Sequence, residues 1–459
     1  MSDDAVERMT AWLAAGGARL GLGIQRVNER ERGACALRAI AVDEVVMEIP
    51  SRYLITEELA LGSEVGRRIT ASGASLNTPH SVIAAYLLQE RRDPGSPFQP
   101  YFDALPREYP HMPVYFNERE RFFLKGSFVL GVIDHRWRSY MADYQSLLAH
   151  LPGFDAFTDH DFVWARLTIA SRIFGMMVNG RRTRALVPLA DMLNHRFPQE
   201  TGWHYDERAA AFVLTALQGF AAGDPIHTAY GRRSNTHLLL NYGFVLEENE
   251  HDECLLKLSV PDGDPFLDVK AAALAPAGAS RSFQVAAGYQ REGVRKMFSF
   301  LRFALADPDE LAQLTTPDGF DVGGIAPISA RNEAAALRAI AAAAKAALAG
   351  FDTTAEQDAA ILRKLPLTPN MKSGVVLRRG EKRVLRHYLE LAASAAPLLH
   401  LSRAELARLL ESRPDIATRP DLQPYFEGVV IPLAERRASG PESAGECATG
   451  APRPPSSGA

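Results

Sequence analysis

A long helical segment divides the β-rich part of this sequence in two, and this division constrains the fold more than any other feature. Alternating apolar positions over residues 24–55 indicate short strands, and strand character returns over residues 186–244. Between these regions, over residues 79–185, the apolar positions follow helical spacing and the connections are rich in proline. The sequence therefore predicts a β-rich core that is split by a helical insertion.

The C-terminal part predicts a second domain that is all-helical. Beyond about residue 261 the sequence is mostly alanine-rich, and apolar residues recur with the spacing of one helix face at positions 294, 297, 298 and 301. A length of 459 residues agrees with two or three domains. From about Ser439 to Ala459 the chain has almost nothing to bury, so we expect a disordered tail.

Charge and cysteine content exclude several classes of protein. Fifty-one Lys plus Arg against 55 Asp plus Glu give a net charge of -4, which disfavours indiscriminate nucleic-acid binding. Cys35, Cys254 and Cys447 are far apart and odd in number, which supports neither a disulfide framework nor a zinc knuckle and fits a reducing compartment. The N-terminus is acidic where a signal peptide would be basic, and there is no apolar run of about 18 residues. We expect a soluble, cytoplasmic protein without a membrane or nucleic-acid partner.

Three short motifs carry a family resemblance. They are Leu-Val-Pro-Leu-Ala-Asp-Met-Leu-Asn-His at 186–195, Ala-Tyr-Gly-Arg-Arg-Ser-Asn at 229–235 and Asn-Tyr-Gly-Phe at 241–244. Together they resemble the SET-domain protein methyltransferases, and most closely the subgroup of the Rubisco large-subunit lysine methyltransferase and the actin histidine methyltransferase. The resemblance covers roughly residues 18 to 400. Further marks are Pro100-Tyr101, Ser171-Arg172 and the Arg-Gly-Glu-Lys segment at 379–382.

The resemblance implies an α+β fold with a defined order of parts. A β-rich SET core, interrupted by a helical insertion, is followed by an all-helical substrate-binding domain. We expect these parts at 18–78 (first part of the SET core), 79–185 (insertion), 186–257 (second part of the core, with the motifs), 258–436 (substrate-binding domain) and 437–459 (tail). The threading of a SET core comes from the resemblance alone, because general topology rules disfavour threaded chains.

The implied reaction is attack of a neutral amine on the methyl carbon of S-adenosylmethionine. Such a transfer mainly needs two reactants held in line with water excluded. By resemblance, Tyr230 and Tyr242 are the catalytic residues, since both tyrosines face the transfer site in the family. A phenol can hydrogen-bond the amine while its ring walls the channel. The alternative is that both are structural tyrosines beside flexible glycines.

The resemblance also assigns the cofactor contacts, to Asp191, Asn194 and His195 and to the Ser171-Arg172 pair. An amide offers donor and acceptor, and a guanidinium fork suits the carboxylate of the cofactor. Alternatively, the residues at 191–195 cap a helix or His195 is a core histidine, and Arg172 is a surface residue at a helix end. No carboxylate or cysteine lies at ligand spacing from His195, so we predict no metal.

Gly33 and Phe244 complete the predicted cofactor site, together with Tyr230. Gly33 falls where the family has a glycine-rich turn, although Ala34-Cys35 departs from the usual Gly-Leu pattern. Phe244 would stack on the adenine, or it is an apolar strand residue in the core.

We therefore predict a protein-lysine N-methyltransferase that acts on an accessible lysine of a non-histone protein. Lysine is favoured over histidine because Phe174 stands where the resemblance places an aromatic residue in the lysine enzyme and an asparagine in the histidine enzyme. Tyr242 likewise matches a tyrosine that the histidine enzyme lacks. Met176 is a departure from the lysine enzyme, because the resemblance places a second arginine of that enzyme at this position. The alternatives are a protein-histidine methyltransferase and, from another class, a catalytically inactive SET-fold interaction module.

Overall fold

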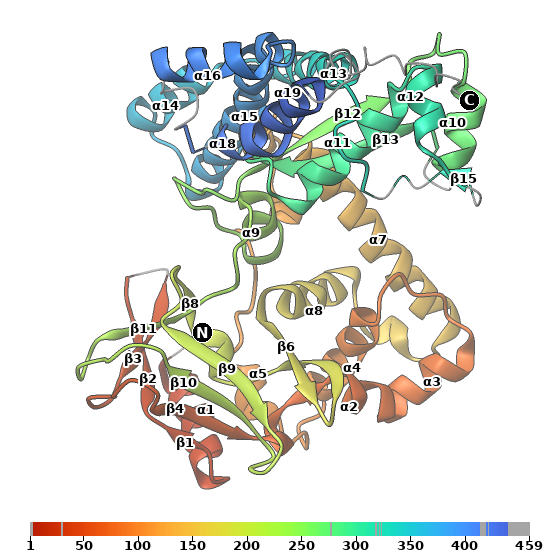
Figure 1. Ribbon diagram of the computed structural model, residues 1–459. Coiled ribbons are helices and arrows are strands. Elements are labelled where there is room, and N and C mark those ends of the chain that lie inside the picture. The colour runs from red at the N-terminus through yellow and green to blue at the C-terminus, as the bar shows by residue number, and fades with distance from the viewer. Residues whose placement is uncertain are drawn as a thin grey trace, which may run out of the picture. The chain divides into compact units, whose positions relative to one another are not determined.

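The chain divides into two compact units. The computed structural model (Figure 1) describes residues 3–28, 31–275, 278–316, 319–320, 322, 324–413, 419–420 and 422–438. Unit 1 comprises residues 1–125, 129–249 and 365–377, and unit 2 comprises residues 126–128, 250–364 and 378–459. Apart from residues 437 and 438, which end a helix, the predicted disordered tail lies outside the described residues.

The described residues of unit 1 form three small sheets. The first is antiparallel, in the order β1 (Arg19–Leu20), β4 (Val45–Pro50), β10 (Ala211–Ala216) and β9 (Thr201–Asp206). The second has the order β2 (Leu22–Arg26), β3 (Arg32–Ala36), β11 (Pro225–Thr228) and β8 (Asn194–His195), and its last pair is parallel. The third has the order β5 (Ile55–Thr56), β7 (Arg181–Leu186) and β6 (Ile173–Val178). Because β4 pairs with β10 and β3 with β11, the predicted split β-rich core is confirmed.

Helices precede and interrupt these strands. They are α1 (Asp3–Ala15), α2 (Glu57–Gly62), α3 (Glu64–Ser72), α4 (His80–Arg92), α5 (Gln99–Ala104), α6 (Glu118–Phe122), α7 (Val129–His150), α8 (Asp159–Arg172) and α9 (Asn235–Tyr242). Of these, α4 and α8 have long fully buried stretches, at residues 81–88 and 162–169. The insertion is therefore packed into the core of unit 1 rather than attached to its surface.

Two segments of unit 1 differ from the sequence predictions. Residues 173–186 form a β-hairpin where a helical pattern was expected, because Asn179 and Gly180 take positive φ values of 49° and 71° and make a two-residue turn. Residues 235–242 form a helix where strand character was expected. The side chain of Ser234 caps it by accepting from the His237 N–H, and Gly243 ends it at a φ of 76°.

Unit 2 is mainly helical, as predicted, and adds a pair of strands. Its helices are α10 (Leu267–Ala273), α11 (Glu292–Ala304), α12 (Pro308–Gln313), α13 (Ala330–Ala349), α14 (Ala355–Lys364), the greater part of α15 (Pro369–Ala395), α16 (Arg403–Ser412), α18 (Gln423–Tyr425), a π-helical turn (Phe426–Val430) and α19 (Ile431–Ala438). The predicted apolar face of α11 is buried. Strands β12 (Glu253–Ser259) and β13 (Ser280–Ala286) pair antiparallel, and β14 (Thr315–Thr316) pairs with β15 (Gly319–Phe320).

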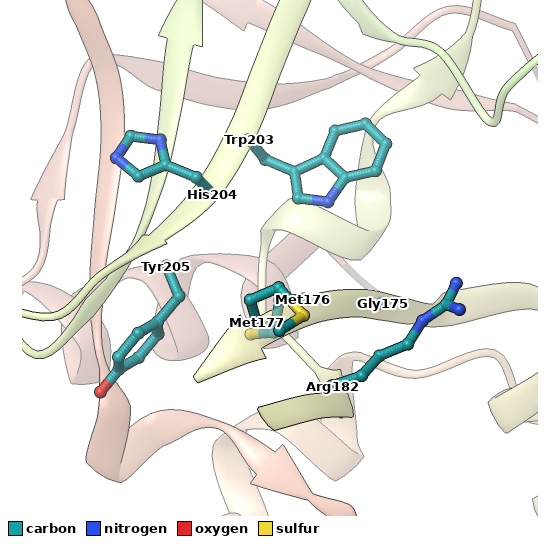
Figure 2. A pocket seen from close by; sticks show the side chains of 7 residues that line it. All are labelled: Gly175, Met176, Met177, Arg182, Trp203, His204 and Tyr205. Atoms are coloured by element: carbon teal, nitrogen blue, oxygen red, sulfur yellow. The ribbon is translucent and has the colours of Figure 1, made fainter. Parts of the chain in front are cut away.

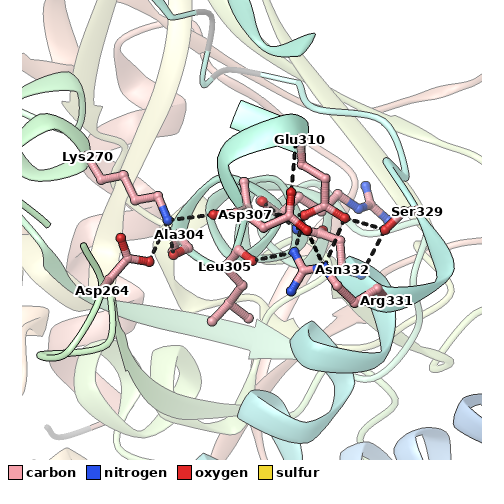
Figure 3. A network of polar contacts seen from close by, with 11 residues as sticks. Asp264, Lys270, Ala304, Leu305, Asp307, Glu310, Ser329, Arg331 and Asn332 are labelled. Carbon is pink, nitrogen blue, oxygen red and sulfur yellow. Dashed lines mark hydrogen bonds and ion pairs between the residues drawn. The ribbon is translucent and has the colours of Figure 1, made fainter. Parts of the chain in front are cut away.

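A network of polar contacts in unit 2 includes a buried lysine (Figure 3). The ammonium of Lys270 is fully buried and donates to Asp264 Oδ2 at 2.6 Å and to the carbonyls of Ala304 and Ala306 at 3.2 and 2.8 Å. The lysine therefore caps the C-terminal end of α11 by donating hydrogen bonds there, where the last carbonyls of a helix have no partner within it. None of the helices in the described parts of the chain has the length and apolar character needed to span a bilayer.

Candidate functional site

The aromatic residues of the three motifs meet in unit 1. Tyr230 follows β11, Tyr242 is the last residue of α9, and His195 lies in β8. The ring of Tyr230 stacks on Tyr242, with centroids 4.3 Å apart, and on His195, with centroids 5.1 Å apart. Phe244 lies within 6.1 to 6.3 Å of all three rings. Residues that the sequence separates by up to 49 positions thus form one aromatic cluster.

Hydrogen bonds fix the central tyrosine of this cluster. Its hydroxyl donates to the Leu193 carbonyl at 2.8 Å, and its backbone N–H donates to His195 Nδ1 at 3.0 Å. Burial, with the adjacent Tyr242, raises the pKa of Tyr230, and burial lowers the pKa of His195. Both groups are therefore neutral at physiological pH. The Tyr242 hydroxyl has no hydrogen-bond partner among the described residues.

The Asn194 amide joins β8 to the start of β3. It donates to the Arg32 carbonyl at 2.8 Å and to Glu31 Oε1 at 3.1 Å. Gly33 lies within β3 and pairs with Gln25 of β2, so the turn that the resemblance implied at Gly33 is a strand in the structure. A Cβ atom placed on Gly33 would lie 3.4 Å from the Asn194 nitrogen and 3.2 Å from Val27. A Cβ atom at residue 33 would therefore be tight against the Val27 side chain and in ordinary contact with the amide.

A buried ion pair lies beside the aromatic cluster. Arg172 Nη1 is 3.2 Å from Asp191 Oδ2, which also accepts from the Tyr101 hydroxyl at 2.7 Å. Burial disfavours the charge of Arg172, but the Asp191 carboxylate outweighs burial and raises the pKa of Arg172. Arg172 Nε and Asp191 Oδ1 are buried without a hydrogen-bond partner in the described structure. Buried polar atoms of this kind normally have partners, so the pair has unused capacity to bind a polar ligand.

Comparisons with known proteins place this site in a family. The human actin-histidine N-methyltransferase is 30% identical over 412 residues, which cover 85% of this chain and 69% of the human protein. The dog actin-histidine N-methyltransferase is 31% identical over 413 residues, which cover 85% of this chain and 70% of the dog protein. The Rubisco LSMT substrate-binding family matches residues 261–385. This chain belongs to the SET-domain protein methyltransferases.

Solved structures share the fold of this methyltransferase. The SET domain of LSMT bound to lysine and AdoHcy superposes with a TM-score of 0.73 at 24% identity, covering 92% of this chain and 98% of that one. Rubisco LSMT bound to AdoMet gives a TM-score of 0.71 at 26% identity, covering 90% of this chain and 97% of that one. The predicted α+β SET fold with a helical substrate-binding domain is confirmed, as is the prediction of a protein-methylating enzyme.

Two of the predicted site residues have other contacts in the methyltransferase. The Ser171 hydroxyl donates to the Leu167 carbonyl at 2.8 Å within α8. The ring of Phe174 packs edge-on against Trp203 and Phe212, with centroids 5.5 and 5.3 Å apart. These contacts describe a residue packed against β9 and β10, so a role for Phe174 in a substrate channel stays a prediction.

Tyr101 and His111 lie at the edge of the site, and the sequence assigned a role to neither of them. Tyr101 supports Asp191, and its only sequence signal was the Pro100-Tyr101 mark of the family. A Cβ atom on Gly243 would lie 2.2 Å from the His111 ring, so the loop before η2 (Pro113–Tyr115) packs against the end of α9. In the described part of the chain, no three His, Cys, Asp or Glu side chains are arranged to hold a metal ion.

Proposed function

We propose that this methyltransferase transfers the methyl group of S-adenosylmethionine to the side-chain nitrogen of a lysine in a non-histone protein. The observation that carries the proposal is the pair of phenol oxygens on stacked Tyr230 and Tyr242. The Tyr230 proton is used by the Leu193 carbonyl, so the lone pairs of that oxygen remain available. The Tyr242 oxygen has no partner among the described residues. Two acceptors suit a neutral lysine amine, which has two N–H groups to place.

The residues around these tyrosines fit the methyl donor. Arg172 and Asp191 have unpartnered buried atoms that suit the charged amino-acid end of the cofactor. The Asn194 amide and the small Gly33 allow close approach of the chain, and Phe244 offers a ring for the adenine. Bound S-adenosylmethionine supplies a methyl group on a positively charged sulfur.

The side chains of the site prepare the target nitrogen. A lysine, with a reference pKa of about 10.4, must lose its proton before it can attack. Desolvation against the stacked rings and a nearby positive charge both disfavour the ammonium form. Arg172 lies close enough for its charge to lower the pKa of Tyr230, so positive charge is already present beside the cluster.

A histidine target is the second candidate. The human and dog relatives found by sequence comparison are actin-histidine enzymes, which are 30 to 31% identical to this chain. The lysine enzymes found by structure comparison share the fold at 24 to 26% sequence identity. An imidazole attacking through one nitrogen has only one N–H left to donate, and an apolar wall beside it would leave that group unpaired at a cost of about 1 to 3 kcal/mol.

Product analysis decides between the two targets. The wild-type chain is incubated with tritiated S-adenosylmethionine and a cell extract, and the labelled proteins are hydrolysed for amino-acid analysis. Methyllysine is expected, with much less label from the Asn194→Ala control. Methylhistidine without methyllysine would refute the lysine proposal. An absence of cofactor binding by calorimetry would instead favour an inactive interaction module. The cytoplasmic location and the absence of a nucleic-acid partner stay predictions, which fractionation of tagged protein can test.

A further inference from the structure

A single buried carboxylate joins neighbouring strands of unit 1. Glu200 directly precedes β9 and is 6% exposed. Its Oε2 atom accepts from the backbone N–H of His227 in β11 at 3.2 Å and lies 2.9 Å from the Nδ1 atom of the same residue. Its Oε1 atom accepts from Arg196 Nη1 at 3.0 Å. Arg196 is the residue that follows β8, so donors from the end of β8 and from β11 meet at one carboxylate.

The carboxylate of Glu200 is ionised in the folded unit. Burial opposes the charge, but hydrogen bonds from Arg196 and His227 outweigh burial and lower the pKa of Glu200. An ionised carboxylate can only accept hydrogen bonds, so His227 Nδ1 carries a proton and donates to it. Hydrogen bonds to a charged group are stronger than those between neutral groups. Glu200, Arg196 and His227 are called the Glu200 cluster below.

The two strands that meet at the Glu200 cluster are otherwise paired over a short length. Strand β8 has two residues, and its parallel pairing with β11 places Asn194 opposite His227 and His195 opposite Thr228. Parallel pairing is slightly less stable per residue than antiparallel pairing. So short a pair fixes the strands weakly by itself, and the side-chain hydrogen bonds of the cluster add to it.

The residue after Glu200 ties β9 to the same place. The Thr201 hydroxyl, at the start of β9, donates to the His227 carbonyl at 2.9 Å. Figure 2 shows β9 further along, where it forms one wall of a pocket of about 330 Å³ with Trp203, His204 and Tyr205. The Glu200 cluster therefore lies where β8, β9 and β11 come together.

The strands that the cluster joins carry residues assigned to methyl transfer. Strand β8 consists of Asn194 and His195, and Tyr230 lies two residues beyond the end of β11. The Tyr230 N–H donates to His195 Nδ1 at 3.0 Å, and the Tyr230 hydroxyl donates to the Leu193 carbonyl at 2.8 Å. Both bonds run from the segment after β11 to the chain at β8. A displacement of one strand against the other would therefore lengthen both.

We propose that Glu200 is a positioning residue for methyl transfer. Its carboxylate fixes β8 against β11 and thereby holds the cofactor residues Asn194 and His195 at the correct distance from Tyr230. The inference rests on the proposed function, because that function assigns the roles of these three residues. A misplacement of about 1 Å can cost about a hundredfold in rate, so a residue outside the aromatic cluster can control the reaction.

Three substitutions test the carboxylate and its side-chain donor. Glu200→Gln keeps the size of the side chain but places an NH₂ group against either Arg196 or His227, which are themselves donors. His227→Leu removes the side-chain donor to Glu200. His227→Asn retains an N–H donor close to the position of Nδ1, so it should keep the bond to Glu200 without an imidazole.

Asp143→Asn is the matched control for a loss of stability. Asp143 is a fully buried carboxylate of α7 that accepts from the Ser81 hydroxyl, the Asn77 backbone N–H and Arg166. These partners lie in α4, in the loop before it and in α8, and not in β8 or β11. The control therefore weakens a buried polar network of the same unit without releasing the strands of the transfer site.

The readouts are calorimetry with S-adenosylmethionine and the initial rate of tritium transfer to extract proteins at saturating cofactor. Both are measured well below the unfolding temperature of each variant. Glu200→Gln and His227→Leu should each raise the cofactor Kd and lower the transfer rate by about tenfold or more. His227→Asn should stay within about threefold of the wild type. Asp143→Asn should keep both wild-type values although it unfolds at a lower temperature.

Unchanged Kd and transfer rate in Glu200→Gln would overturn the inference. Equal losses in Asp143→Asn would overturn it as well, because the effect would then follow from stability alone. So would a His227→Asn variant as impaired as His227→Leu, because the donor to Glu200 would then not be what matters. A wild type that binds no S-adenosylmethionine would refute the proposed function and this inference with it, whereas the other three results refute the inference alone.

Discussion

Replacing Glu381 with glutamine should remove a pH-dependent loss of stability from unit 2. Glu381 lies in α15, 3% exposed, and its Oε1 accepts from the Ser127 hydroxyl at 2.5 Å. Burial raises the pKa of Glu381 to about 8, and the charge of Asp252 adds to this, against the Ser127 hydrogen bond and Lys382, which lower it. The carboxyl is therefore protonated in the folded unit at neutral pH.

The direction in which the stability of unit 2 changes with pH follows from proton binding. Between the ordinary pKa of 4.5 and about 8, the folded unit binds one proton more than the unfolded chain, so its stability is fully present below 4.5 and falls as the pH rises to about 8. At about 1.4 kcal/mol per pKa unit, the loss is on the order of 5 kcal/mol. Glutamine keeps the shape of the neutral acid and cannot ionise, so Glu381→Gln should escape this loss.

Two probes separate the units during urea unfolding at about pH 4 and about pH 9. Hydrogen exchange of residues 378–395 reports unit 2. Fluorescence reports unit 1, because all four tryptophans, at positions 12, 137, 164 and 203, lie there. The exchange of wild type and variant should agree at the lower pH, and the variant should be better protected at the higher pH, with identical fluorescence transitions.

Equal protection of both proteins at both pH values would refute the reasoning. It would mean that Glu381 ionises in the folded unit at little cost.

Three further predictions concern single side chains. Tyr230→Phe removes the donor to the Leu193 carbonyl, so kcat should fall by about tenfold or more and stability by about 1 to 3 kcal/mol, with cofactor affinity retained, as measured by turnover, thermal unfolding and calorimetry. Asn194→Ala frees the turn at residues 31–32, and calorimetry should show cofactor binding weakened by about tenfold or more with an unchanged circular dichroism spectrum. Lys270→Met removes the partner of Asp264 Oδ2 and of two carbonyls, which should destabilise unit 2 by about 3 to 5 kcal/mol in denaturant unfolding while Lys270→Arg costs less.

The sequence predicted those features that depend on short, local patterns. The motifs with Asn194, His195, Tyr230 and Tyr242 were visible because each is a few residues long, and the structure brings their side chains together. The split of the β-rich core was visible because strand periodicity stops and resumes. The pairing that reunites the two parts came from the family resemblance and not from periodicity.

Features decided by distant contacts or by single turn residues could not be predicted in the same way. The helical pattern before β6 hid the turn at Asn179 and Gly180, where two positive φ values reverse the chain. The apolar run before Tyr242 has no period of its own, so only the cap at Ser234 shows that it is helical. The neighbours of Phe174 come from β9 and β10, which no local pattern reveals.

The strand pairings around β11 also set the time at which this enzyme can first act. Strand β3 ends at residue 36, and its partner β11 begins at residue 225, with the whole helical insertion between them. Contacts between such distant residues form slowly, because the closure of a long loop must be compensated before they contribute stability. A chain still being synthesised contains Gly33 from an early stage but lacks the aromatic cluster until Phe244 has left the ribosome. Until then the growing chain has no complete place for a methyl donor and cannot modify its neighbours.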